Sequence, residues 1–387
     1  MNSELENSRK KNIWLQLATI AGKTASFHSD NLRYWNGFMR LMMSEKMIDE
    51  LEKNHNIRLP NLTEFEEHVI KATIQERGFP RGIDYLKNTD TFKFSSGDFN
   101  KKTNFSNFVF PKEVKFGGAE FKASIIFDGA VFLEDAVFEY ADFQKNAKFD
   151  GTFFYRKARF NGATFHRLVS FRAATFGKIE LLKAKFLFSP PAFFDSNLSQ
   201  DISWDGVRFP ELSKHEGPAT IHRNAYECLA LLMSKLEKHH DRHAFFRLEM
   251  RARRVLEKKW FPKALNYAYE ALSDYGYGIY RAAKWWAGNI AVGTIILLIR
   301  KDVRIVAPSH ESIYEAMQIF TKALATSFSN AHGFFGMNRG PLKKTVEAYQ
   351  TAELVIPFNV IAVTQTIIGA VFLFFLLLCS RNRFRMN

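Results

Sequence analysis

Cysteine is scarce in this sequence, which has two, Cys228 and Cys379, among 387 residues. They lie far apart, and Cys379 stands in an apolar run, so we expect no disulfide framework of the kind that staples small secreted domains. A secretory signal peptide is also not expected, because the apolar stretch near the N-terminus is short and interrupted by Gln16. Acidic residues are outnumbered: 54 Lys and Arg face 40 Asp and Glu, a formal net charge of +14.

Motifs for catalysis are absent as well. The sequence contains no phosphate-binding loop, nucleophile elbow or zinc-ligand spacing. His239, His240 and His243 stand together with Asp241 on a basic helix, but no nearby residue completes a metal site, so we interpret them as solvated surface residues. We therefore expect no enzyme, no cofactor and no metal centre.

What the sequence does contain is a phenylalanine at every fifth or sixth position from Phe94 to Phe176. A helix would fan such residues around its axis, and a strand would place them on alternating faces. A fixed short period instead indicates a solenoid whose chain turns a corner every five or six residues. The series is Phe94, Phe99, Phe105, Phe110, Phe116, Phe121, Phe127, Phe132, Phe138, Phe143, Phe149, Phe154, Phe160, Phe165, Phe171 and Phe176.

The segments AEFKASIIFDGAVFLEDAVFEYADFQKNAKF and ARFNGATFHRLVSFRAATF carry this pattern, and they resemble pentapeptide-repeat proteins whose repeats alternate five and six residues. The resemblance implies a right-handed, four-sided parallel β-helix over residues 92–209. At about 4.8 Å per coil, roughly five coils would make a rod of about 25 Å. Twelve residues, from Phe116 to Phe176 in the series above, are expected to form its core.

Some members of that family imitate DNA with an acidic rod. Residues 92–209 hold 17 Lys or Arg against 13 Asp or Glu, which is the wrong sign for such a mimic. No nucleic-acid partner is expected. After Phe176 the period becomes less regular, as the terminal coil of a solenoid should, because it must cover an exposed core.

Residues 1–91 show helical spacing of apolar residues, with Leu32, Trp35 and Phe38 among them. Two interpretations are open, an interaction or sensing module and a helical cap for the first coil, and the cap is the simpler one. Residues 210–281 are predicted to be a basic helical linker. Between Lys235 and Lys263 ten Lys or Arg face four acids, which favours a juxtamembrane segment attracted to anionic head groups.

Residues 282–387 are predicted to be a membrane domain with spans at 282–300 and 354–379. The run from Leu354 to Cys379 carries no charge and exceeds the roughly 20 residues that cross a bilayer core. The earlier run contains Lys284, which can extend to the interface, and Trp285 and Trp286, which suit an aromatic belt. Basic residues before the first span and after the second predict a multi-pass plasma-membrane or bacterial inner-membrane protein, with both termini and the β-helix in the cytoplasm.

Between the spans, residues 312–338 are predicted to form an amphipathic helix ending near Thr326, followed by a polar, glycine-containing turn. Span, short helix, turn and span is the layout of two-span tetrameric ion channels, which the C-terminal half resembles. The resemblance implies an oligomeric, channel-like pore, with a β-helix that binds or senses a protein partner. The alternative is a non-conducting membrane-anchored scaffold. The residues expected to line the pore are Ser327, Ser329, Asn330, Gly333, Gly336, Asn359 and Thr366.

Overall fold

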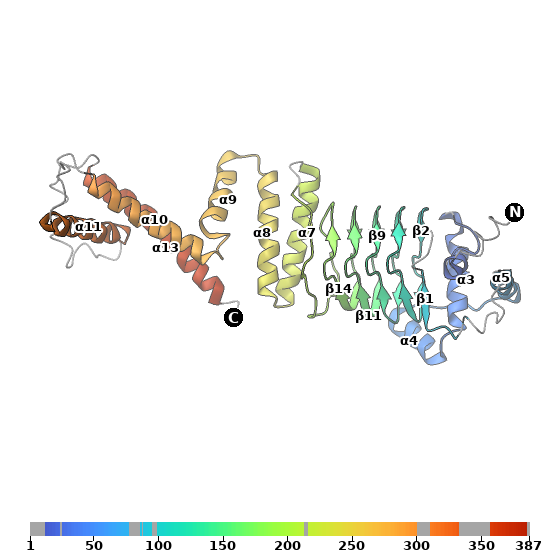
Figure 1. Ribbon diagram of the computed structural model, residues 1–387. Helices are drawn as coiled ribbons and strands as arrows, with labels where there is room; N and C mark the ends of the chain where they lie inside the picture. Colours follow the sequence, from blue (N-terminus) through green and yellow to red (C-terminus); the bar gives the residue numbers. More distant parts are fainter. Residues whose placement is uncertain are drawn as a thin grey trace. The chain divides into compact units, whose positions relative to one another are not determined.

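The computed structural model describes residues 12–23, 25–76, 86, 88–94, 99–212, 216–299, 310–332 and 357–384. The chain divides into two compact units, Met1–Leu256 and Glu257–Asn387, which we take in turn (Figure 1).

The first unit contains a parallel β-solenoid made of very short strands. Its strands are β1 (Thr91–Lys93), β2 (Thr103–Asn104), β3 (Val109–Phe110), β4 (Glu113–Lys115), β5 (Glu120–Phe121), β6 (Ile125–Ile126), β7 (Val131–Phe132), β8 (Ala136–Val137), β9 (Asp142–Phe143), β10 (Ala147–Lys148), β11 (Phe153–Arg159), β12 (Thr164–Phe165), β13 (Val169–Ser170), β14 (Thr175–Glu180) and β15 (Lys185–Phe186).

The register between strands confirms the predicted coil. Val114 pairs with Ala136 and Ala136 with Ala158, so one coil takes 22 residues, as the alternating period requires. Two four-stranded sheets form two sides, and the long strands β11 and β14 join the other two sides into one seven-stranded sheet. Each four-stranded sheet holds one strand per coil, so the regular part makes about four turns. The right-handed direction in which the chain winds around the solenoid axis stays a prediction from the family resemblance.

The phenylalanines of the series lie inside the solenoid, where their rings stack on one another. Phe138 lies fully buried between Phe116 and Phe160, with ring centroids 4.9 Å away on both sides and planes within 5°. There are four such columns of stacked rings, one for each side of the coil. Each coil contributes one phenylalanine to each column. Where the period fails, Leu181 and Leu198 are buried in place of phenylalanine. The last coil is held to the one before by isolated bridges such as Lys185 to Arg208, which agrees with a less regular end.

Helices close the first coil. They are α2 (Ile13–Leu17), a 3-10 turn (Ala25–Phe27), α3 (His28–Arg40), α4 (Glu45–His55) and α5 (Glu64–Glu76). Trp35 of α3 is buried against Phe92, Phe108 and Phe110, and its indole Nε1 donates to the Val109 carbonyl at 2.9 Å. The side chain of Asn36 bonds both the Asn107 carbonyl and the Val109 amide. α3 therefore covers the end of the aromatic core and occupies backbone groups of the exposed edge.

Two helices close the other end, α7 (Glu216–Lys235) and α8 (His239–Leu256). Phe245 of α8 packs edge-on to Trp204 and Phe209 of the last coil, and Tyr226 of α7 packs on Phe209. The predicted linker 210–281 is thus split, since its first two helices belong to the solenoid unit and the division lies after Leu256. The sequence analysis expected the irregular last coil to cover the exposed core at this end, whereas apolar residues of α7 and α8 pack on that coil.

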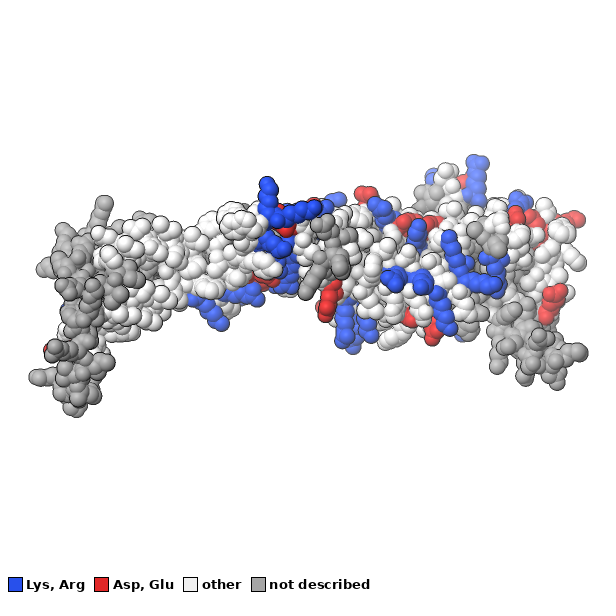
Figure 2. Space-filling model, turned by 90° about the horizontal axis from the view of Figure 1, so that it is seen from above, with Lys and Arg blue, Asp and Glu red and all other residues white. Residues whose placement is uncertain are grey.

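The second unit consists of α9 (Trp260–Ser273), α10 (Ile279–Leu298), α11 (His310–Ala331) and α13 (Phe358–Phe384). Among the described residues, α13 is the one helix long and apolar enough to cross a membrane, by length and composition. α10, which contains most of the first predicted span, does not reach that level. The predicted two-span hairpin is therefore not confirmed, because Arg281, Lys284 and Asn289 lower the mean hydropathy of α10. Figure 2 shows charged side chains spread over the solenoid unit and very few on the described surface of the C-terminal helices.

Candidate functional site: the polar core of the C-terminal helices

Helices α10, α11 and α13 pack against one another, and polar residues lie where they meet. Gln365 of α13 is at the centre. Its side-chain Nε2 donates to the Asn289 carbonyl of α10 at 3.2 Å and to the hydroxyl of Ser327 on α11. Ser327 in turn donates to the Ile290 carbonyl at 2.6 Å. The Gln365 side-chain amide thus connects α13 with both α10 and α11.

Two glycines allow these helices to approach closely. A Cβ on Gly369 of α13 would overlap the Ala331 carbonyl oxygen of α11, and a Cβ on Gly293 of α10 would overlap the Gln365 amide. Beside the first contact, the Thr366 hydroxyl bonds the Asn330 carbonyl at 2.8 Å. Small residues and hydroxyl groups at helix contacts are the usual means by which helices associate in lipid.

The polar core is not fully satisfied. Both amide atoms of the Asn330 side chain, Oε1 of Gln365 and Nε1 of Trp286 are buried and have no hydrogen-bond partner in the part of the chain that the structure describes. Leaving such groups unpaired costs about 1–3 kcal/mol each, which favours a further hydrogen-bond partner for the Asn330 amide.

The predicted pore residues fall into three groups. Ser327, Ser329 and Asn330 are buried, and Thr366 is half-buried against α11. Asn359 is exposed near the start of α13. Gly333 and Gly336 lie outside the described residues. Whether any of them lines a pore stays a prediction, but Ser327 and Thr366 bond groups of their own chain.

Helix α11 differs from the sequence expectation. The predicted helix ends near Thr326 and gives way to a polar turn, whereas α11 continues to Ala331. The reason is local: Ser327, Ser329 and Asn330 are tolerated in a helix when their side chains meet other helices, and the first glycine comes only at Gly333. The signal missed was that these positions repeat at helical spacing with Ala323 and Thr326, which are buried on the same helix.

Gln365 and Asn289 are functional candidates that the sequence analysis did not select. The Asn289 side-chain Nδ2 donates to the backbone carbonyl of Gln365 at 3.3 Å. In return, the Gln365 side-chain Nε2 donates to the backbone carbonyl of Asn289. An amide in each of two apolar segments is the sequence signal that could have identified the pair, because an isolated amide in such a segment needs a partner.

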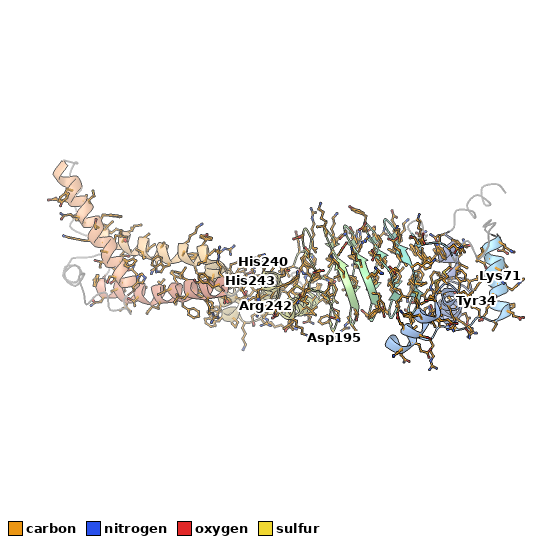
Figure 3. The ribbon with its side chains drawn as sticks, turned by 90° about the horizontal axis from the view of Figure 1, so that it is seen from below. Tyr34, Lys71, Asp195, His240, Arg242 and His243 are labelled. Atoms are coloured by element: carbon orange, nitrogen blue, oxygen red, sulfur yellow. The ribbon has the colours of Figure 1, made fainter. Side chains whose placement is uncertain are left out.

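The histidine cluster of the sequence lies at the beginning of α8, where Figure 3 labels His240, Arg242 and His243. Among the described residues no group of three or more His, Cys, Asp or Glu side chains is placed to hold a metal ion.

A groove of about 890 Å³ lies between the last solenoid coils and α7. Leu168 and Phe194 line it on the solenoid, and Ile221 and Leu231 line it on α7. Arg172 lies over the Phe194 ring at 5.2 Å. Burial raises the pKa of the Cys228 thiol in this groove to about 11, so the thiol stays protonated and unreactive at neutral pH.

Comparison with known proteins gives one result. Residues 105–152 match the family described as pentapeptide repeats (9 copies). No curated protein and no solved structure matches the chain. The matched residues fall within the regular coils of the solenoid, from the end of β2 to the residues before β11.

Proposed function

We propose that this pentapeptide-repeat protein is tethered to a membrane by its C-terminal helical unit, which holds the solenoid at the bilayer surface. The observation that carries the proposal is α13. It has 27 residues, and along it Val360, Val363 and Ile367 are exposed although they are apolar. A helix about 40 Å long can cross a hydrocarbon core of about 30 Å with a tilt. In water such a surface would be a costly apolar patch.

The finer topology is part of the proposal. α10 would also cross the membrane, as the first of two spans, with Lys284 near its start reaching the interface and Trp285 in the aromatic belt. The solenoid and both termini would then lie in the cytoplasm. A cysteine introduced at Asp150 should be inaccessible to a membrane-impermeant reagent added to intact cells, and one introduced at Asn338 should react. Reaction at residue 150 from outside would overturn this orientation.

A protein partner of the solenoid is the second part of the proposal. The groove beside α7 supports it, because Leu168 of the solenoid and Ile221 and Leu231 of α7 are apolar residues that line it and are exposed. Replacing Leu231 with Asp should abolish co-purification of a partner from the native host without changing the unfolding temperature. A partner that is retained by this variant would place binding elsewhere.

A conducting, oligomeric pore is a second candidate function. The observation that favours it is the Asn330 side chain, which is buried without a hydrogen-bond partner among the described residues and so leaves the unit with an unsatisfied polar interior. The observation that favours a non-conducting anchor is that Ser327 and Thr366 are already bonded within one chain.

Ion flux separates the two candidates. Purified full-length protein in liposomes should pass ions if a pore forms, and its mass in detergent should be a multiple of the 44.7 kDa chain. Asn330→Asp should then alter the conductance, while Asn359→Asp tests the exposed predicted residue. A monomer without flux would leave the anchor as the function.

A further inference from the structure

The first helix of the C-terminal unit, α9, exposes apolar side chains and directs polar ones toward the rest of the unit. α9 exposes Trp260 (78%), Phe261 (61%) and Leu265 (61%). These residues share one arc of the helix with Ala264, Ala268 and Ala271, at spacings of one, three and four residues. A helix at a water-facing surface would place charged residues there.

The opposite arc of α9 is polar and faces the neighbouring helices. The Tyr275 hydroxyl lies 2.9 Å from Asn266 Oδ1 and 3.3 Å from a Glu270 carboxylate oxygen, so the two acceptors share its one hydrogen. Tyr269 stacks on Phe375 of α13 with ring centroids 5.8 Å apart. The polar arc is therefore in contact with other residues of the unit, whereas no described residue covers Trp260, Phe261 and Leu265 of the apolar arc.

The contacts of α9 also fix its level along α13. The Cys379 thiol of α13 bonds the Ser273 carbonyl at the end of α9, and the Asn382 side chain bonds the Gly276 carbonyl at 2.9 Å. Cys379 is the last residue of the apolar run, and Arg381 and Arg383 follow it. The end of α9 thus lies beside the place where α13 changes from apolar to basic.

Cations flank the apolar arc. Lys259 immediately precedes Trp260 and is exposed, Lys263 lies on the edge of the arc, and Lys284 is exposed on the adjoining α10. Exposed Tyr280 adds a further aromatic residue near the start of α10. An apolar face with aromatic residues, bordered by lysines, is the composition of helices that lie in the interface of anionic bilayers.

We propose that α9 lies in the head-group region of an anionic phospholipid bilayer, with Trp260, Phe261 and Leu265 inserted about 5–10 Å below the head groups. The inference rests on the proposed membrane insertion of α13, because that helix sets the level of α9. It assigns the lipid contact to α9 and separates it from α7 and α8, whose apolar residues are used to cover the solenoid.

The test uses the full-length protein with Cys228→Ser and Cys379→Ala, in which Phe261→Cys carries an environment-sensitive fluorophore. Liposomes contain phosphatidylcholine with or without phosphatidylglycerol, and lipids bearing a quencher at a shallow or a deep acyl position. We expect the fluorophore to be quenched more strongly by the shallow quencher than by the deep one, with stronger quenching when phosphatidylglycerol is present. Tyr140→Cys, an exposed solenoid position, should respond to neither quencher.

A fluorophore at Leu377→Cys, exposed on α13, reports on the proposed function separately. If residue 377 is quenched by lipid and residue 261 remains open to aqueous iodide, the inference about α9 is wrong and the membrane tether stands. If neither residue is quenched by lipid, both fail. If residue 261 is shielded from iodide and from both lipid quenchers while the protein is a dimer, a second copy covers the arc and the lipid assignment is overturned.

Discussion

The interior of the solenoid and that of the C-terminal helical unit are stabilised by different kinds of contact. The solenoid repeats one contact: in its regular coils an inward phenylalanine stacks on the one 22 residues later, as Phe127 does on Phe149 at 5.1 Å. The helical unit depends on single contacts that do not recur, such as Gln365 joining α10 and α11. The stability lost on replacing a solenoid core residue should therefore follow how much apolar surface that residue buries. In the helical unit the loss should be large at a few particular residues.

The largest expected effect comes from a charge inside the phenylalanine columns. Phe138→Asp places a carboxylate between two stacked rings with no partner, which costs more than a folded domain can lose. We expect the full chain in detergent to lose its β-sheet circular dichroism and become sensitive to protease over the solenoid. Phe138→Leu is the matched control and should cost mainly the ring stacking, about 0.5–1.5 kcal/mol per pair. Equal urea midpoints for Asp and Leu would show that position 138 does not face inward.

Removing the cap should have the next largest effect. Trp35→Ala leaves a cavity over Phe92 and Phe110 at the open end of the core, and we expect a loss of about 3–5 kcal/mol in the free energy of unfolding. Trp35→Phe keeps most of the packing and loses the bond to Val109, so about 1 kcal/mol is expected. Urea unfolding of the full chain measures both. If Trp35→Ala is no more costly than Trp35→Phe, α3 does not seal the solenoid.

In the helical unit, adding a single methyl group at Gly369 should be enough to lower the stability. Gly369→Ala forces α13 away from the Ala331 carbonyl, and overpacking of this kind costs about 1–3 kcal/mol. Gly288→Ala, in α10, is the control, because a Cβ there meets no atom within 4 Å. Thermal unfolding in detergent should therefore separate the two variants, with only Gly369→Ala destabilised. Equal behaviour would mean that the close contact between α11 and α13 is not required.

The smallest effect concerns pH and the surface of the solenoid. Burial raises the pKa of the Asp128 carboxyl, and the bond from the Asp150 backbone amide only partly opposes this. The folded state then holds the proton more tightly than the unfolded state, so this contribution to stability is present below the ordinary Asp pKa of about 4 and is lost as pH rises through the raised value.

Asp128→Asn should remove that dependence. An Asn oxygen can still accept the bond from the Asp150 amide, so the variant should be slightly more stable than the natural protein at neutral pH and equal to it in acid. Urea midpoints measured across acidic and neutral pH check this. A variant that loses stability at neutral pH would show that the carboxylate charge is favourable there.

The two units also differ in how much the sequence reveals. The Phe94–Phe176 period predicted a chain that turns every five or six residues and the residues that face inward, because the same spacing recurs in every coil. The four sides came from the family resemblance. The cap by α7 and α8 could not be predicted, since Tyr226 and Phe245 show only helical spacing and do not indicate that their target is Trp204 and Phe209. In the helical unit, the Gln365 contacts join segments some 38 and 76 residues apart, and spacing along one helix does not determine such pairings.

The most direct test of the membrane tether uses the exposed side of α13. Val363, Ile367 and Phe374 are exposed in the structure, so lysines there would be harmless in water but would each cost about 2.5–3.5 kcal/mol in a bilayer centre. Membranes from cells making the natural protein or the triple lysine variant are washed at alkaline pH. We predict that the natural protein stays in the pellet and that Val363→Lys, Ile367→Lys and Phe374→Lys together release it. Release of the natural protein into the aqueous wash would contradict the account.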